Sequence, residues 1–398
     1  MKRILIAIHY LEIGGAETAL TGLLNAIDYT RVDVDLFLYS HRGEMLAYVP
    51  KEVNLLPEIP EYAQIERPIR QVLKDGYLRI ALARLKAKIQ SWRYLRRRKV
   101  AESTAVMQYA AEALSPLLPQ INPSAEYDLA ISFLNPHNIV RDKVRARKKA
   151  CWIHNDYSVV DVNAEQEMPV WSAFDSIISI SESVTKAFLK AFPSLADKIV
   201  LMENILLPSF IRKRADEFDV TDQMRKDPGI CLLSVGRFSH QKNYDNVPQI
   251  CRSIVEAGIA NVKWYIIGYG KDERLMQLKI AQSGMEDHVI ILGKKTNPYP
   301  YIKACDIFVQ PSRYEGKSIA VREAQILCKP VVATSYPTSS SQIADGIDGV
   351  LAPMDNDGCA RAIVNFIGNK AKQEAIIQYL RTHDYGLESE VEKLYTLI

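Results

Sequence analysis

Short apolar runs separated by helical patterns recur along almost the whole chain, and they constrain its fold more than any other feature. The runs are rich in Val, Ile and Leu with little polar alternation, as expected for strands buried on both faces of a parallel sheet. The predicted strands are Arg3–Ile8, Val32–Tyr39, Tyr127–Ser132, Lys149–Ile153, Phe174–Ser179 and Lys198–Met202 in the first half, then Ile230–Val235, Lys263–Ile267, Val289–Leu292, Asp306–Gln310, Pro330–Ala333 and Asp348–Leu351. Helical patterns between them include Glu17–Ala26, Ala101–Leu117, Val184–Phe192, Val247–Ala257 and Ser318–Leu327. The alternation predicts an α/β protein of two successive doubly wound parallel-sheet units.

The domain boundary is expected where this alternation breaks. At 398 residues the chain is long enough for two domains of ordinary size. Pro208 and a charged run interrupt the pattern within Asn204–Arg225, which is the predicted linker. We therefore expect a first domain over residues 1–205, a second over 206–375, and a helical tail over 376–398 that packs back on the first.

Composition indicates a soluble globular protein, with 48% hydrophobic and 24% charged residues. No apolar run approaches the roughly 20 residues that span a bilayer, and the run after the basic start is too short for a signal peptide. The six cysteines form no Cys-x-x-Cys pair, which predicts reduced thiols in a cytoplasmic protein. The seven histidines lack metal-ligand spacing, so no metal site built by the protein is expected.

The stretch from Tyr314 to Ala324 places two glutamates, Glu315 and Glu323, eight positions apart around a Gly-Lys-Ser turn. Because a predicted strand precedes it, Glu315 is expected on the loop at the strand's carboxyl end, and Glu323 about two turns into the next helix. Ligands of open α/β sheets bind at such loops, beside helix N-termini that attract anions. Acceptors for sugar hydroxyls next to donors for phosphate predict a nucleotide-sugar site. The structural alternatives are a helix cap for Glu315 and a solvated helix face for Glu323.

A second candidate follows the first strand of the second half, at Gly236-Arg237 and Lys242. Gly236 lets the backbone turn and approach a ligand closely. Arg237 can bind phosphate oxygens through its planar guanidinium, and Lys242 adds a mobile charge. A surface loop with solvated charges is the alternative.

Two later strand ends also carry glycine. Gly268 and Gly270 form a Gly-x-Gly turn that allows close approach, although most such turns are structural. Gly293-Lys294 ends the next strand, with Tyr299 shortly after it. Main-chain groups at that strand end are candidates for reading the edge of a nucleobase.

Two motifs in the first half add to these. Gly14-Gly15 precedes the first helix and suits the binding of an anion or a closely packed substrate. The alternative is a turn in which the Glu17 carboxylate interacts favourably with the dipole of the helix. His154 ends a predicted strand. A lone histidine is more often structural than catalytic, and the position of His154 at a strand end adds only modest support for a functional role.

Together the motifs resemble glycosyltransferase family 4, retaining nucleotide-sugar-dependent enzymes with the GT-B fold of two Rossmann-like domains facing a central cleft. The resemblance covers nearly the whole chain and is strongest from Leu232 to Pro353. The motifs in the family's order and spacing are Gly14-Gly15-Ala16-Glu17, Gly236-Arg237 with Lys242-Asn243, Gly268 with Gly270, and Glu315 with Glu323. At Lys317-Ser318 many relatives have an aromatic residue and proline, so the donor's identity stays open.

The resemblance implies a role for each site residue. Arg237 and Lys242 would bind the donor diphosphate, while Glu315 would hold the sugar hydroxyls and Glu323 the ribose hydroxyls. The remaining donor contacts would be Gly236, Gly268, Gly293, Lys294, Tyr299, Gly316 and the amides of Lys317, Ser318 and Ile319, with Gly15 approaching the diphosphate and His154 near the transferred sugar. Family members need no metal, and the nucleotide sugar is a substrate rather than a cofactor.

The resemblance also implies the reaction. A hexose or N-acetylhexosamine would pass from a nucleotide sugar, with UDP favoured, to a glycan or lipid-linked acceptor in surface polysaccharide biosynthesis. We expect front-side attack with retention and no enzyme nucleophile, because stabilising the departing diphosphate dominates such chemistry. A soluble transferase with a small acceptor, as in sucrose or trehalose synthesis, and a catalytically silent nucleotide-sugar-binding subunit are the alternatives.

The segment from Arg67 to Val100 holds twelve Lys or Arg residues and one acid, Asp75. From Leu78, apolar residues at helical spacing include Leu82, Leu85, Ile89 and Trp92. Such a basic amphipathic helix suits the surface of an anionic bilayer, which would place the protein at the inner face of the plasma membrane beside a lipid-linked acceptor. The alternative is a helix that covers its own sheet with its apolar stripe and leaves a solvated basic face. No nucleic-acid-binding motif is present, so nucleic acid is not an expected partner.

Overall fold

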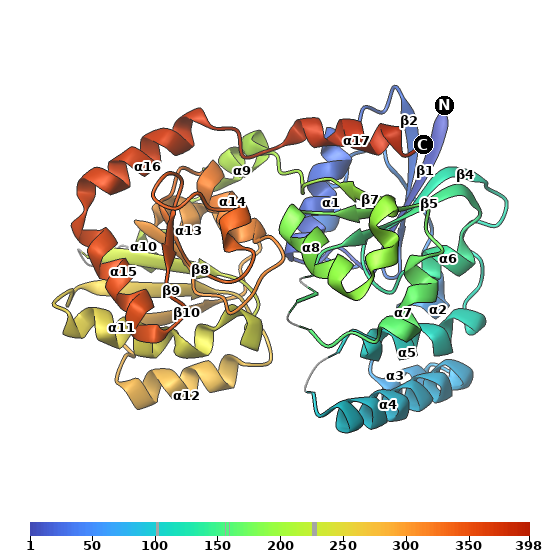
Figure 1. Ribbon diagram of the computed structural model, residues 1–398, viewed down its shortest axis with the longest axis horizontal. Coiled ribbons are helices and arrows are strands. Elements are labelled where there is room, and N and C mark those ends of the chain that lie inside the picture. The colour runs from blue at the N-terminus through green and yellow to red at the C-terminus, as the bar shows by residue number, and fades with distance from the viewer. Residues whose placement is uncertain (101–102, 156, 159, 225–228) are drawn as a thin grey trace. The chain divides into compact units, whose positions relative to one another are not determined.

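The structure is a computed structural model and describes residues 1–100, 103–155, 157–158, 160–224 and 229–398 (Figure 1). The start of the predicted helix at Ala101 and the end of the predicted linker at Arg225 lie outside these residues. The chain divides into two compact units. The first consists of Met1–Ile205 and Glu388–Ile398, and the second of Leu206–Leu387.

The first unit is built on a parallel sheet, seven-stranded within the described residues, in the order β3-β2-β1-β4-β5-β6-β7. The strands are β1 Lys2–Ile8, β2 Val32–Leu38, β3 Asn54–Leu55, β4 Tyr127–Ser132, β5 Ala146–Ile153, β6 Ser176–Ser179 and β7 Ile199–Leu201. Six of them match predicted runs; β3, with two exposed residues, has no apolar signal that would reveal it. The helices are α1 Gly15–Ala26, α2 Pro60–Ala63, α3 Ile69–Lys74, α4 Leu78–Arg98, α5 Ala105–Leu114, α6 Asn138–Lys143, α7 Ala164–Trp171, α8 Glu182–Ala191 and α17 Val391–Thr396.

The second unit has a parallel sheet, six-stranded among the described residues, in the order β10-β9-β8-β11-β12-β13. Its strands are β8 Ile230–Val235, β9 Val262–Ile267, β10 Val289–Gly293, β11 Ile307–Gln310, β12 Val331–Thr334 and β13 Val350–Ala352. The helices are α9 Pro208–Ala215, α10 Thr221–Met224, α11 Val247–Glu256, α12 Glu273–Ser283, α13 Tyr299–Ala304, α14 Ile319–Ile326, α15 Asn356–Gly368 and α16 Lys370–Thr382. The predicted doubly wound α/β organisation is confirmed.

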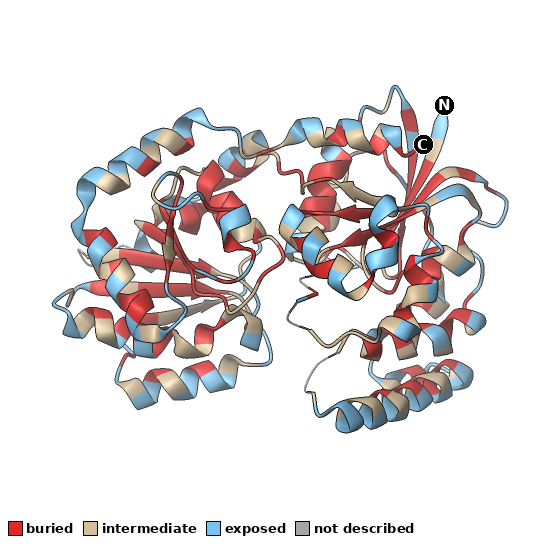
Figure 2. Cartoon of the chain, in the orientation of Figure 1, coloured by how far each residue is buried: buried red, intermediate tan, exposed pale blue. Residues whose placement is uncertain are grey.

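Both faces of this second sheet are buried, as the unbroken apolar runs predict (Figure 2). Successive strand residues point to opposite faces, so Leu232 enters one core cluster and Leu233 the other. Residues of α11, α12, α15 and α16 complete the first cluster, and residues of α9, α10, α13 and α14 complete the second. With helices on both faces, ligands can reach this sheet only at the ends of its strands.

The predicted linker and tail boundaries are wrong in part. The charged stretch after Pro208 is not an extended linker, because it forms α9 and α10, whose residues Ile211 and Met224 are buried in the second unit's core. The second unit also continues past residue 375 to Leu387, since Ile376 and Leu380 of α16 complete its other cluster. Of the predicted tail over residues 376–398, only Glu388–Ile398 belongs to the first unit.

The returning segment is held in the first unit by apolar and polar contacts. Val391, Leu394 and Leu397 are buried. The Arg31 guanidinium lies 3.7 Å from the centroid of the Tyr395 ring and 3.1 Å from the Glu392 carboxylate. Helix α17 is therefore part of this unit's core although it is the last helix of the chain.

Leu394→Ala is expected to lower the free energy of unfolding by about 2–5 kcal/mol, because Leu394 is fully buried and its truncation leaves a cavity. Urea unfolding followed by tryptophan fluorescence measures the change. Glu392→Ala is the matched control on the same helix: its exposed ion pair is worth less than about 1 kcal/mol. Equal effects of the two substitutions would contradict this packing of α17.

Candidate functional site

The strand order of the second sheet reverses between β8 and β11, which lie side by side. In open α/β sheets this reversal opens a binding position at the carboxyl ends of the two strands. The loop after β8 carries Lys242, and the loop after β11 carries Glu315. The two residues, 73 positions apart in the sequence, meet there.

Direct contacts between the two loops bring these side chains together. Asn243 adopts a left-handed conformation with φ of 60°, which asparagine tolerates better than most residues. Its side-chain amide donates to the Pro311 carbonyl at 2.9 Å, and the Arg313 amide donates to the Gln241 carbonyl at 2.8 Å. Lys242 is therefore positioned by its neighbours on both sides.

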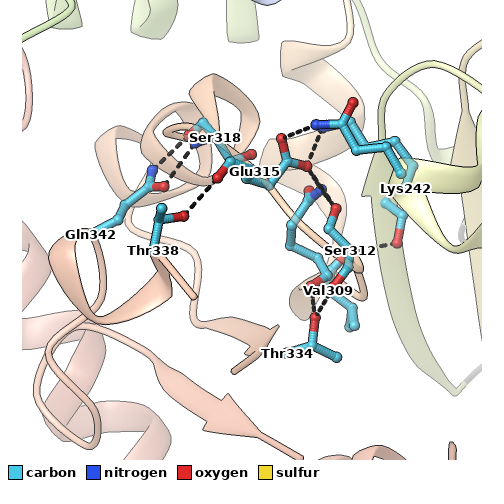
Figure 3. A network of polar contacts seen from close by, with 11 residues as sticks. Lys242, Val309, Ser312, Glu315, Ser318, Thr334, Thr338 and Gln342 are labelled. Atoms are coloured by element: carbon cyan, nitrogen blue, oxygen red, sulfur yellow. Dashed lines mark hydrogen bonds and ion pairs between the residues drawn. The ribbon is translucent and has the colours of Figure 1, made fainter. Parts of the chain in front are cut away.

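The Glu315 carboxylate accepts four hydrogen bonds (Figure 3). Its Oε1 lies 2.6 Å from Lys242 Nζ, 2.6 Å from Ser312 Oγ and 3.0 Å from Gln310 Nε2. Its Oε2 accepts from Gln241 Nε2 at 3.1 Å. The side chains of Lys242 and Glu315 are only 15% and 7% exposed, so the ion pair is largely shielded from water. The helix-cap alternative for Glu315 is wrong, because these four groups hold its carboxylate.

The loop after Glu315 is fastened by polar residues that follow β12. Thr338 Oγ1 donates to the Glu315 carbonyl at 2.7 Å. Gln342 accepts from the Ser318 amide at 2.8 Å and donates to the Ser318 carbonyl at 2.6 Å (Figure 3). The expectation that the Ser318 amide is available to a donor substrate is therefore wrong for this conformation, since Gln342 occupies it. The same loop contains Gly316, Lys317 and, as the first residue of α14, Ile319.

Some buried hydroxyl groups near Glu315 have no hydrogen-bond partner in the described part of the chain. Ser318 Oγ, Tyr244 Oη and Tyr336 Oη are buried and make no hydrogen bond among the described residues. Burial and, next, the Glu315 charge raise the pKa of both tyrosines well above its usual value, so both hydroxyls stay protonated. Because buried polar groups are rarely left unpaired, these three hydroxyls are candidates to bind a ligand or water.

Glu323 is the fifth residue of α14, nearer the helix start than predicted, and is 6% exposed, so the solvated-face alternative is wrong. Its carboxylate accepts from the Tyr299 hydroxyl at 2.9 Å. Burial raises the pKa of Glu323 to about 7, while the Tyr299 hydrogen bond acts in the opposite direction. The side chain of Tyr299 thus contacts Glu323. The sequence had predicted only main-chain contacts to a nucleobase at this strand end.

Glycines after β8 and β9 allow the strand-end loops to pack closely. A Cβ on Gly268 would lie 1.9 Å from the Gly236 carbonyl oxygen, and one on Gly270 would lie 2.3 Å from the Phe238 carbonyl oxygen. A Cβ on Gly236 would lie 3.0 Å from Lys242 Cε. Glycine at 236 therefore leaves room for the lysine side chain that reaches Glu315.

The remaining predicted residues of this unit lie at the same sheet edge. Arg237 is exposed, and no hydrogen bond or ion pair holds its guanidinium within the part of the chain described. Gly293 ends β10 with φ of 72°, and the Lys294 ammonium lies 5.1 Å from the centroid of the Tyr269 ring. Within the described ranges, no group of three or more His, Cys, Asp or Glu residues is placed to hold a metal ion.

The first unit places its two predicted residues at the carboxyl edge of its own sheet. Gly15 starts α1, directly after Gly14; a Cβ on Gly14 would lie 2.2 Å from Glu17 Oε2, so the Glu17 carboxylate covers this helix start. His154 follows β5, and burial lowers the pKa of its imidazole to about 3, which keeps it neutral. Its Nε2 is buried with no partner among the described residues.

Several residues of the site carried too little sequence signal to be singled out. Gln241, Gln310, Ser312, Thr338 and Gln342 are common polar residues, and their importance follows only from the contacts they make with Glu315 and Ser318. Ser312 had the best signal, because a polar residue after a proline at the end of a buried strand marks a strand-end loop.

The match to a known protein family lies within the second unit. Residues 217–383 match the family described as glycosyl transferases group 1. The amylovoran biosynthesis glycosyltransferase AmsK of Erwinia amylovora is 30% identical over 152 residues, 36% of each chain. An N-acetylgalactosaminyltransferase of Campylobacter jejuni that acts on N-acetylgalactosamine-N,N'-diacetylbacillosaminyl-diphospho-undecaprenol is 31% identical over 129 residues, 32% of this chain and 34% of that one. The chain thus spans little more than a third of these two relatives' length.

The fold comparison covers the whole chain. HepE of Anabaena in complex with UDP-glucose superposes with a TM-score of 0.69 over 100% of both chains, at 15% sequence identity. At that identity the likeness shows the fold alone. Residues 217–383 are therefore similar to glycosyl transferases group 1, in a chain that has the GT-B fold of two Rossmann-like units.

Proposed function

We propose that this protein is a retaining, metal-independent glycosyltransferase, with a nucleotide sugar, preferably a UDP-sugar, as its donor. The transferred group is a hexose or N-acetylhexosamine, and the acceptor is a glycan or lipid-linked glycan of a surface polysaccharide. The matched relatives named for amylovoran synthesis and for an undecaprenol-linked acceptor support this choice. The Lys242–Glu315 ion pair at the strand reversal is the observation that carries the proposal.

The pair suits the two halves of a nucleotide sugar. The ammonium of Lys242 has three N–H groups and directs one to Glu315, which leaves two for phosphate oxygens. Glu315 fixes the orientation of that ammonium and offers further lone pairs to sugar hydroxyls. Since water is largely excluded, the lysine charge stabilises a departing diphosphate more strongly than it would at an exposed site.

The hydrogen bonding of Glu315 supports retention without an enzyme nucleophile. A carboxylate that accepts four hydrogen bonds, one from an ammonium, is a poor nucleophile. An acceptor hydroxyl attacking from the face of the leaving diphosphate can instead pass its proton to a phosphate oxygen. Lys242 and the exposed Arg237 balance the charge that develops, which is the role a metal ion plays in other transferases.

The other site residues complete the assignment. Glu323 accepts from the ribose hydroxyls, backbone groups around Gly293 bind the base, and the buried Ser318 hydroxyl contacts the sugar or phosphate. For the first unit, the family resemblance implies further donor contacts at Gly15 and His154. The six cysteines are free thiols, five of them buried, which supports a cytoplasmic location.

Thermal unfolding with UDP, GDP and ADP, each with and without EDTA, is the direct test. UDP is expected to raise the melting temperature, because a ligand at about 100 times its Kd adds about 2.7 kcal/mol of stability. The shift should survive EDTA. No shift with any nucleotide would overturn the donor site, and a shift abolished by EDTA would overturn metal independence.

Lys242→Ala and Glu315→Gln are expected to lower the rate at which the enzyme releases UDP from a UDP-sugar donor by about 10²- to 10³-fold. That is the usual effect of removing a group that stabilises transition-state charge. Lys303→Ala is the matched control, since this lysine pairs with Asp216 on the surface. Unchanged rates in the first two variants would contradict the site. Nucleotide binding without turnover in the unmodified protein would favour a silent binding subunit.

UDP affinity is expected to rise with pH through about 7, the raised pKa of Glu323. Below that pH the carboxyl is protonated and loses an acceptor for the ribose hydroxyls; above it, the carboxylate accepts from both. Titration calorimetry from pH 5.5 to 8.5 measures this change. Glu323→Gln keeps the shape without the titration, so the difference in pH dependence between the two proteins isolates Glu323 from the ionisation of UDP itself. Identical pH profiles would exclude Glu323 from the nucleotide site.

A further inference from the structure

Helix α4 of the first unit carries a row of large apolar residues that are exposed, and exposed positions recur along this helix in Figure 2. The exposed fractions are 58% for Leu78, 57% for Leu82, 47% for Leu85, 44% for Ile89 and 57% for Trp92. These residues are three or four positions apart, so they form one line along the helix. A single exposed leucine needs no explanation, whereas five aligned apolar side chains do.

The opposite face of α4 fixes this orientation. Ile80, Ala81, Ala87 and Ser91 are buried where α4 packs against α3 and α5. The Arg84 guanidinium donates to the backbone carbonyls of Gln64 and Arg67, and near the other end Tyr94 and Arg98 bind the Asp161 carboxylate. The apolar stripe therefore does not cover the unit's own sheet, and that alternative from the sequence is wrong.

Basic side chains line one side of the exposed row. The residues directly after positions 78, 85, 92 and 96 are Arg79, Lys86, Arg93 and Arg97. One position along a helix is a rotation of about 100°, so these four side chains lie on the same side of the row. All four are exposed and have no ion-pair partner among the described residues. Arg96, in line with the row, lies 5.2 Å from the centroid of the Trp92 ring. No acidic residue occurs from Gly76 to Val100.

We propose that this face of α4, the apolar row Leu78, Leu82, Leu85, Ile89 and Trp92 with its basic flank, docks on an anionic lipid bilayer. The helix lies parallel to the surface, with the row in the acyl boundary and the flank among the phosphate headgroups. Charge complementarity selects this occupant: a continuous basic flank without acids fits a uniformly anionic surface better than a protein face of mixed charge. No helix in the described part of the chain has the length and hydropathy to cross a membrane.

The docking face is already formed in the folded protein. The anchoring contacts of Arg84, Tyr94 and Arg98 involve residues outside the row, so substitutions in the row leave these contacts in place. Docking brings the protein to the membrane that holds the lipid-linked acceptor of the proposed function. It does not depend on the transfer reaction. Lipid binding by Lys242→Ala, which lacks the donor-site cation, separates the two: docking is expected to be unchanged there.

The test is flotation of the full-length protein with phosphatidylcholine vesicles containing 40% or no phosphatidylglycerol. One variant replaces the row (Leu85→Gln, Ile89→Gln and Trp92→Gln), and another replaces the flank (Lys86→Gln, Arg93→Gln and Arg97→Gln). The matched control removes three exposed lysines elsewhere (Lys51→Gln, Lys190→Gln and Lys370→Gln). Thermal unfolding and sedimentation velocity of every protein report its folding and its oligomeric state.

The unmodified protein and the control are expected to float with anionic vesicles and to remain unbound with neutral ones. Each basic residue near an anionic surface contributes about a fivefold change in partitioning, so the flank variant should bind about a hundredfold more weakly. The row variant should lose binding with an unchanged melting temperature, and added salt should weaken binding of the unmodified protein.

Three outcomes would overturn the proposal. Equal binding to neutral vesicles would remove the role of charge, and equal losses in the control and flank variants would show that only net charge matters. No flotation, combined with a dimer that the row variant converts to monomer, would assign the face to a second copy of the chain.

Discussion

Burial of both faces of the second unit's sheet is the constraint on which the site depends. Leu232 and Leu233 lie on opposite faces of one strand and both are fully buried, as are their neighbours Phe308 and Val309. An unpaired polar side chain in these layers would be costly, so the polar chemistry is displaced to the strand ends. The reversal between β8 and β11 then determines which two loops can share a ligand.

A buried charge at that position requires extensive compensation. Removing Lys242 and Glu315 from water carries a large desolvation cost, which is offset only when geometry and additional hydrogen bonds are good. Ser312, Gln310 and Gln241 supply those bonds. Thr338 and Gln342 then hold the backbone of the same loop. The four groups that donate to the Glu315 carboxylate fix its orientation and so pre-organise the charge for a ligand.

The sequence predicted the fold well because its signal was local and repeated. Unbroken apolar runs identified β8 to its exact bounds and most other strands to within a few residues. Glu315 and Lys242 were identifiable because Glu315 directly precedes a Gly-Lys-Ser turn and Lys242 follows Gly236-Arg237, each in the loop after a predicted strand. Spacing alone could not show that Gln342 occupies the Ser318 amide, since that contact joins residues 24 positions apart. Nor could helical periodicity tell whether the α4 stripe faces inward or outward, because both arrangements share one pattern; the buried Ala81, Ala87 and Ser91 decided it.

The return of the chain to its first unit has a consequence for the order of folding during synthesis. Residues 1–205 leave the ribosome first, yet their core also needs Val391, Leu394 and Leu397, which are made after the whole second unit. Domains generally fold as units in the order in which they are synthesised. Here the second unit has its full complement of residues before the first does. The unit that is begun first is completed last, and until then the surface that α17 will cover stays open to solvent.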